Sequence, residues 1–505
     1  MPQPTSHPNI LIFMVDQLTG TLFPDGPVDW LHVPNLRALA QRSVRFSSCY
    51  CPSPLCAPAQ ASFMTGQLPL KTEVFDNAAE MRADIPTFAH TLRSAGYQTS
   101  LVGKMHFVGP DQLHGFEERR TTDIYPADYG WTPDYRKPDE RVDWWYHNMS
   151  SVTAAGVAEI TNQLEYDDEV AHGARARVYD LARGIDPRPW MLTVSFTHPH
   201  DPFVARRRFW DLYEECEHLL PEVAPIPWEE QDPHSRRILE GCDWRNYSIT
   251  DEDIRRARRA YFANISYLDE QIGSILEALR ATDPRAEENT VILFLSDHGE
   301  MLGERGLWFK MSPFESSSRV PLFIAAPGLE PHCVTEPVSL VDIHPTLAEL
   351  AGTKAPGDLD GESLLPIAGG ETRREPVRIE YAAETSVAPI VTIRRGRWKY
   401  THCAPDPDLL FDLAADPREL SNLAGEASAA AVLKEFGALR DQYWDLDAYD
   451  VTVRQSQLRR LTVYGALRKG TYTPWEFVPR RDESNRFMRN HMDLNEVEEK
   501  NRFPR

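Results

Sequence analysis

The chain has 505 residues, 42% of them hydrophobic, and a formal net charge of −22. This length and apolar content suffice for one large hydrophobic core and a smaller one, which predicts two unequal domains and excludes a disordered chain. So acidic a chain disfavours nucleic acid and anionic membranes as partners. An anionic substrate would therefore need a local pocket of basic side chains.

The N-terminus and the cysteines indicate a cytoplasmic protein. Residues 1–9 lack the charged start of a signal peptide, and the apolar run 10–15 is too short for a signal core or a membrane span. The seven cysteines are scattered along the chain, which fits a reducing compartment better than a disulfide framework. We therefore expect a soluble, cytoplasmic protein.

Five short apolar runs have the length and composition of strands, and helical patterns separate them. The runs are nearly continuous rather than alternating, which is typical of buried parallel strands. Strands that alternate with helices predict an α/β core with a mainly parallel sheet. The runs are 10–15, 99–102, 190–196, 291–295 and 320–324, and the helical segments include 33–42, 87–95 and 254–279.

The pattern changes near residue 380. Residues 391–400 and 410–413 read as strands joined by turns, which predicts a small antiparallel sheet. A charged tail with prolines follows Asp450, and such a tail is either disordered or docked on another surface. The expected division is a catalytic α/β domain over 1–380, a small α+β subdomain over 381–450 and an oligomerisation tail over 451–505.

Polar residues follow the carboxyl ends of four predicted strands, where open α/β sheets bind their ligands. Asp16, Asp297 and His298 offer the oxygen and imidazole donors that suit a divalent cation, although a strand-end aspartate can also simply cap a helix. Lysines and histidines there could neutralise an anion and exchange protons with a leaving group. These residues are Asp16, Lys104, His106, His198, His200, Asp297 and His298.

The segment from Ser53 to Gly66 is predicted to contain one short helix together with the residues that begin and end it. Pro58 suits the first turn, which tolerates a missing N–H, and Gly66 suits the end. Cys56 would then lie at a helix N-terminus, where the dipole favours an anion and lowers the pKa of a thiol. The alternative is an inert, buried thiol.

Cys56-Ala57-Pro58-Ala59-Gln60 followed by Met64-Thr65-Gly66 resembles the sulfatase signature, Cys-x-Pro-x-Arg before a hydrophobic residue and Thr-Gly or Ser-Gly. In that family a formylglycine-generating enzyme oxidises the cysteine to formylglycine, whose hydrated aldehyde is the nucleophile. The resemblance implies an alkaline-phosphatase-like sandwich, and a divalent metal bound by Asp16, Cys56, Asp297 and His298. Calcium is the first candidate for that metal, with manganese and magnesium as alternatives. Gln60 departs from the signature, because the family's arginine helps both maturation and the binding of the hydrate and the metal.

Further motifs extend the resemblance. Gly103-Lys104-Met105-His106 matches the family's Gly-Lys-x-His, 198–200 matches a histidine-containing strand end, and Lys310 supplies the last expected cation. The resemblance implies that His200 with Lys310 protonates the leaving alkoxide. It also implies that His106, beside Lys104, takes a proton from the second hydroxyl of the hydrate, so that sulfate is expelled.

Segments 111–117, 125–128, 143–148 and 491–493 are similar to choline sulfatases, nearly from end to end. This resemblance implies choline-O-sulfate as substrate, whose quaternary ammonium needs aromatic faces and a carboxylate. It also implies a homotetramer in which a C-terminal arm reaches a neighbouring active site. The substrate contacts carried over are Asn77, Trp131, Trp145, His147, Glu384 and Asp493.

Two other functions remain open from the sequence. A phosphonate monoester or phosphodiester hydrolase could share the Asp-His metal motif and the formylglycine. A non-catalytic binder of quaternary ammonium sulfates would result if Gln60 blocks the maturation of Cys56.

Overall fold

The computed structural model describes residues 7–138, 140–141, 146–471, 487–488 and 492–500. Its centre is an eight-stranded sheet in the order β12-β2-β11-β9-β1-β7-β4-β5. The pairs β1/β7, β1/β9, β4/β7, β4/β5 and β2/β12 are parallel, so the mainly parallel α/β core is confirmed. The strands are β1 (Asn9–Asp16), β2 (Val44–Phe46), β4 (Gln98–Gly103), β5 (Glu118–Arg119), β7 (Trp190–Pro199), β9 (Thr290–Ser296), β11 (Leu322–Ala325) and β12 (Cys333–Val334).

The apolar run 320–324 differs from its expected form, a single buried parallel strand. Pro321 divides it, because proline has no N–H to donate to a sheet ladder. The residues before it form β10 (Arg319–Val320), which pairs with β3 (Cys49–Tyr50) in a separate small sheet. The residues after it form β11, which is antiparallel to both of its neighbours, β9 and β2.

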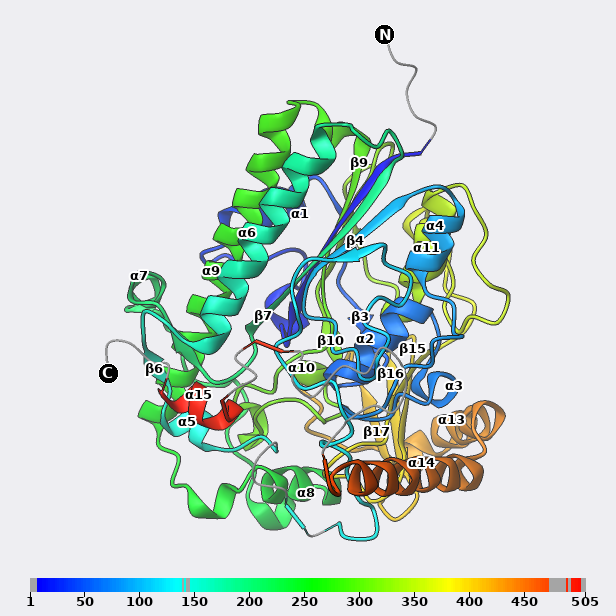
Figure 1. Ribbon diagram of the computed structural model, residues 1–505. Helices are drawn as coiled ribbons and strands as arrows, with labels where there is room; N and C mark the ends of the chain where they lie inside the picture. Colours follow the sequence, from blue (N-terminus) through cyan, green and yellow to red (C-terminus); the bar gives the residue numbers. More distant parts are fainter. Residues whose placement is uncertain (1–6, 139, 142–145, 472–486, 489–491, 501–505) are drawn as a thin grey trace.

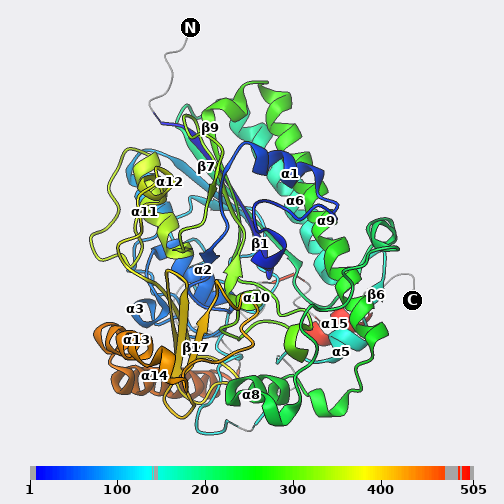
Figure 2. The same cartoon turned by 180° about the vertical axis from the view of Figure 1, so that it is seen from behind.

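Helices cover both faces of the central sheet, as Figures 1 and 2 show. Successive side chains of a strand point to opposite faces, and β1 divides its apolar residues between two cores accordingly. Leu11, Phe13 and Val15 pack in the core beneath α6 (Asn162–Ala182) and α9 (Asp251–Thr282). The other core contains Ile10, Ile12 and Met14, and it is covered by α2 (Cys56–Thr65), α4 (Phe88–Ser94) and α11 (Ile343–Leu350).

A second, antiparallel sheet and two helices form the C-terminal module at the lower end of the molecule (Figure 1). The sheet begins at Val377, before the expected boundary at 380/381, because β14 pairs residue by residue with β15. Likewise α14 continues across 450/451, so the segment expected to be a tail starts as a helix. The elements are β14 (Val377–Tyr381), β15 (Ile390–Arg395), β16 (Trp398–Cys403), β17 (Leu409–Asp412), α13 (Ala430–Tyr443) and α14 (Leu446–Leu467).

The described remainder of the C-terminal segment contacts the large domain of the same chain. The backbone N–H of Met488 donates to the Asp123 carbonyl at 3.1 Å. Asn162 at the start of α6 donates to Glu498 of α15 (Leu494–Lys500) at 3.3 Å. Across the described ranges, no helix is long and apolar enough to cross a membrane.

Gly103, which ends β4, offers a test of how closely β4 and β7 approach. Its φ is +112°, and a Cβ added there would lie 1.9 Å from the Ser195 carbonyl oxygen. We expect Gly103→Ala to lower the free energy of unfolding by about 3 kcal/mol or more, through overpacking and backbone strain. Gly437→Ala in α13 is the control, because its Cβ would meet nothing within 4 Å. Urea denaturation measures both, and an unchanged Gly103→Ala stability would contradict the close approach.

Candidate active site

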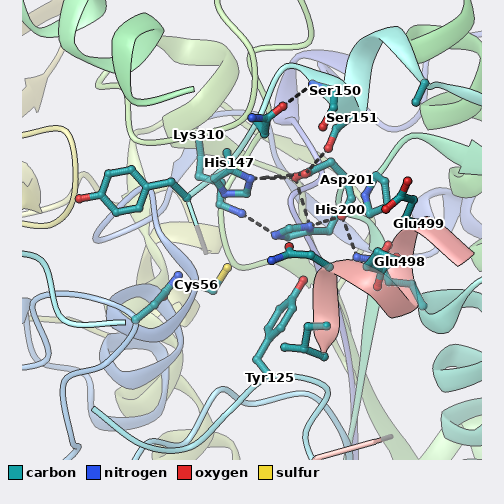
Figure 3. Close-up of a pocket in the computed structure, with 18 of the residues that line it drawn as sticks. Cys56, Tyr125, His147, Ser150, Ser151, His200, Asp201, Lys310, Glu498 and Glu499 are labelled. Carbon is teal, nitrogen blue, oxygen red and sulfur yellow. Dashed lines mark hydrogen bonds and ion pairs between the residues drawn. The ribbon is translucent and has the colours of Figure 1, made fainter. Parts of the chain in front are cut away.

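Four adjacent strands, β4, β7, β1 and β9, direct polar side chains to one edge of the central sheet. Asp16 is the last residue of β1, Lys104 follows β4, His200 follows β7 and Asp297 follows β9. Since parallel strands end at the same edge, residues far apart in the sequence meet there. Figure 3 shows part of this edge, with Cys56 approaching Lys310 and His200 from α2.

Four of these side chains form a cluster that could bind one metal ion. The Cys56 Sγ lies 3.2 Å from the His298 Nε2 and 3.8 Å from an Asp16 oxygen. The His298 Nε2 is 3.5 Å from Asp16 and 3.7 Å from the Asp297 Oδ2. All four donor atoms lie within 4.8 Å of one another, and all four residues are buried. Donors about 2.0–2.6 Å from an ion are separated by distances of this order.

The electrostatics of the cluster also fit a cation. Burial, with Asp297 close by, raises the pKa of Asp16 to about 7. Burial lowers the pKa of His298 to about 3, so its imidazole is neutral and can offer a lone pair. A divalent cation would compensate the two buried carboxylates, which are costly to leave uncompensated.

Helix α2 has the predicted limits, but the thiol at its start behaves differently from the expectation. Gly66 ends the helix with a left-handed φ of 71°, and the Asn77 Oδ1 accepts a hydrogen bond from the N–H of Ala57 in the first turn. The expected lowering of the Cys56 pKa was wrong, because burial and the nearby Asp16 raise it to about 12. The unmodified thiol is therefore protonated near neutral pH and a weak nucleophile.

Two buried glutamines bind the groups around the cluster. The Gln60 Nε2 donates to the Asp297 Oδ2 at 2.8 Å. The Gln17 Oε1 accepts from the Lys310 ammonium at 2.5 Å, and its Nε2 donates to the Glu300 carboxylate. Both the Oε1 and the Nε2 of Gln17 therefore form hydrogen bonds with other side chains.

The lysines and histidines form two groups around the cluster. The Lys104 ammonium pairs with Asp16. The His200 Nδ1 faces the Asp201 carbonyl at 2.6 Å, so its Nε2 can accept from the Lys310 ammonium, also at 2.6 Å. Lys310 is therefore the proton-bearing member of this pair.

His106 is buried behind the pocket wall. Burial and the Lys104 charge lower the pKa of His106 to about 3. Its ring lies 5.5 Å from that of Tyr125 and 6.0 Å from that of Trp131. The imidazole is therefore neutral near pH 7, and so low a pKa makes it a weak base while the Lys104 charge is present.

A cavity of about 590 Å³ opens onto the cluster at Cys56. Of the predicted substrate contacts, Asn77, Trp131, His147 and Glu384 line it. Asp493 does not line it, since its carboxylate accepts from the backbone N–H groups of Asn495 and Glu496 at the start of α15. Trp145 lies outside the described residues. The α15 residues Leu494, Asn495, Glu498 and Glu499 line the cavity instead (Figure 3).

The cavity also contains groups that the sequence analysis did not select. Tyr125 lies under the Lys104 ammonium, 4.6 Å from the ring centroid, and 5.4 Å from the Trp131 ring. Tyr125 belongs to the segment 125–128, which resembles choline sulfatases, and this resemblance was the sequence signal that could have identified it as a site residue. Asp201 contacts both His147 and His200 at 3.3 Å, and nothing in its local sequence indicated that role.

Glu384 contributes a carboxylate to the lining of the cavity. Its side chain is buried, and its Oε2 has no hydrogen-bond partner within the described ranges. Burial raises its pKa to about 7. A buried carboxylate of this kind is poised to accept a cation from a ligand.

Comparison with known proteins agrees with this geometry. The family model "Sulfatase" matches residues 8–353. The chain belongs to the sulfatase family, whose members are sulfuric ester hydrolases. Its C-terminal segment, residues 451–503, matches the family model "Choline sulfatase enzyme C terminal", and residues 303–444 match "N-sulphoglucosamine sulphohydrolase, C-terminal".

Individual relatives align with most of the length of this chain. It is 62% identical to the choline-sulfatase of Rhizobium meliloti over 510 residues, which covers 99% of each chain. It is 28% identical to the multifunctional alkaline phosphatase superfamily protein PehA of Trinickia caryophylli, over 88% of this chain and 96% of that protein. The solved phosphonate monoester hydrolase of Agrobacterium radiobacter superposes with a TM-score of 0.66 at 25% identity, over 86% of this chain and 96% of that one. The predicted fold and the resemblance to choline sulfatases are thus confirmed.

Proposed function

We propose that this sulfatase hydrolyses choline-O-sulfate to choline and sulfate. The observation that carries the proposal is one cavity that reaches the metal-type cluster (Asp16, Cys56, Asp297 and His298) at Cys56 and is also lined by the buried Glu384, whose Oε2 has no hydrogen-bond partner among the described residues. The 62% identity to a protein named choline-sulfatase supports the same substrate.

The cavity wall has the chemistry that a quaternary ammonium requires. Such a head group has no N–H to donate, so it binds aromatic faces and carboxylates rather than hydrogen-bond acceptors in a fixed geometry. Trp131, Tyr125 and His147 supply rings, and Glu384 supplies the negative charge. A phosphodiesterase pocket needs no such wall, which makes the phosphonate or phosphodiester alternative the weaker candidate.

The roles of the remaining residues follow from their positions. Formylglycine, made from Cys56 by a formylglycine-generating enzyme, would supply a hydrated aldehyde as nucleophile, and a divalent ion would supply positive charge beside it. Asp16, Asp297 and His298 would hold that ion, with calcium as first candidate and manganese or magnesium as alternatives. Lys310, whose ammonium donates to the His200 Nε2, would give a proton to the leaving oxygen. Lys104 would neutralise sulfate oxygens, and neutral His106 would accept a proton.

Peptide mass spectrometry combined with a turnover assay tests this function. Protein expressed beside its own maturation enzyme should release sulfate from choline-O-sulfate, and the Cys56 peptide should carry formylglycine in at least part of the molecules. Cys56→Ala should abolish turnover, because no other group replaces the nucleophile. Turnover with an unmodified thiol alone would reject the nucleophile, and formylglycine without any turnover would reject the substrate.

The pH dependence of KM tests the role of Glu384. Its carboxylate is charged above a pKa of about 7, so lowering the pH from 8 to 6 protonates it. We expect KM for choline-O-sulfate to rise by about tenfold over this range, since the ionised fraction falls by that factor. Glu384→Gln should have a high KM that no longer follows pH there, and an aryl sulfate without a cation is the substrate control. The same pH slope in Glu384→Gln would exclude this role.

A homotetramer and a cytoplasmic location complete the proposal. All seven cysteines are unpaired, as a reducing compartment would leave them. In this structure α15 lines the cavity of its own chain. In the proposed tetramer, the tail of a neighbouring chain would bring its Asp493 to that cavity. Sedimentation velocity should report a tetramer for the full chain and a smaller species after removal of residues 491–505. A full-length monomer would exclude the shared site.

A further inference from the structure

Gln60 lies one helical turn after Cys56 and on the same face of α2, since residues four apart on a helix are neighbours. Both side chains are buried and both reach the metal-type cluster. Cys56 contacts His298 and Asp16, and the Gln60 Nε2 donates to Asp297 at 2.8 Å. Helix α2 therefore contributes two groups to the cluster.

The oxygen that Gln60 binds is the one that faces the other donors. The Asp297 Oδ1 accepts from the backbone N–H groups of Gln17 and of His298, at 3.1 Å and 2.8 Å. The Oδ2 lies 3.7 Å from the His298 Nε2, toward the centre of the cluster. Gln60 is the hydrogen-bond donor to this Oδ2 within the described ranges, so its amide fixes the orientation of the donor oxygen.

The Gln60 amide does this without adding charge. Its Oε1 is buried and has no hydrogen-bond partner among the described residues, so the side chain is not fully satisfied here. A cationic donor in the same place would stand within hydrogen-bond distance of a carboxylate that must also face a divalent ion. Two like-signed groups that share one carboxylate compete for it, strongly so in a buried site.

We propose that Gln60 is a positioning residue of the metal site, which orients the Asp297 Oδ2 while leaving its full charge to the bound divalent cation. The chain consequently binds that cation more tightly than it would with arginine, the residue of the sulfatase signature, at this position. The inference rests on the metal site of the proposed function, and it concerns affinity rather than turnover.

Calorimetric titration with CaCl2 and with MnCl2 tests the inference. The full chain is expressed without a maturation enzyme, so that Cys56 stays a thiol in every variant, and metal is first removed with chelator. We expect Gln60→Arg to weaken the binding of either ion by tenfold or more. Gln60→Met, which keeps size and neutrality but loses the donor, should weaken it by about threefold to tenfold, because Asp297 is no longer held.

Gln67→Arg is the matched control. The Gln67 Nε2 also donates to an aspartate at 2.8 Å, but that aspartate is Asp358, outside the cluster. Its metal affinity should equal that of the wild type. Thermal melting in chelator checks that each variant folds, and Gln60→Lys replaces Gln60→Arg if the arginine is not accommodated.

The outcomes separate this inference from the proposed function. Wild-type affinity in Gln60→Arg, or in its lysine substitute, overturns the role of charge, and wild-type affinity in Gln60→Met overturns the role of the donor. If the wild-type chain binds neither ion, the metal site fails and this inference fails with it. If the metal affinities follow the expected order but the wild-type chain expressed with its maturation enzyme does not hydrolyse choline-O-sulfate, the inference stands and only the proposed function fails.

Discussion

Two buried carboxylates at the ends of neighbouring strands, Asp16 and Asp297, set the constraint on which the site depends. Water is excluded from both, and an uncompensated charge at such depth costs several kcal/mol. Lys104, the residue directly after β4, forms an ion pair with Asp16 and compensates its charge. Asp297 receives backbone N–H groups and the Gln60 amide. These contacts compensate the two carboxylates only in part, and a divalent cation would neutralise the negative charge that remains.

The cavity lining carries charges of both signs. Lys310 and the start of α2 could bind an anion, and the carboxylates of Glu384, Glu498 and Glu499 could bind a cation. With a net charge of −22, the chain repels polyanions at long range. A small zwitterion is neutral overall, so it is not repelled at long range, and it carries opposite charges that match the two kinds of charged group in the cavity. This complementarity explains why we favour choline-O-sulfate over other sulfate esters.

Local signals in the sequence sufficed for the elements that carry the chemistry. The apolar runs before Asp16 and Asp297 identified β1 and β9, and Pro58 and Gly66 identified α2. Effects of tertiary burial could not be predicted this way. The pKa of Cys56 is raised rather than lowered, because the thiol is buried and lies near the Asp16 carboxylate. The direction of β11 depended on sheet pairing, which the run 320–324 does not specify.

Support for the cavity extends into the C-terminal module of the same chain, whereas the resemblance implied only a contribution from the C-terminal arm of a neighbouring chain. Arg460 of α14 makes two hydrogen bonds to Asp76, both 2.7 Å long, and a third to Thr132 at 3.0 Å. All three side chains are buried, and Asp76 and Thr132 are the chain neighbours of Asn77 and Trp131. One guanidinium therefore ties together the loops that present two lining residues of the cavity. Because a planar, bidentate pair constrains direction as well as distance, α14 acts as a part of the site's framework. Arg460 belongs to the segment that matches the choline sulfatase C-terminal model, so this segment helps to shape the wall of the cavity.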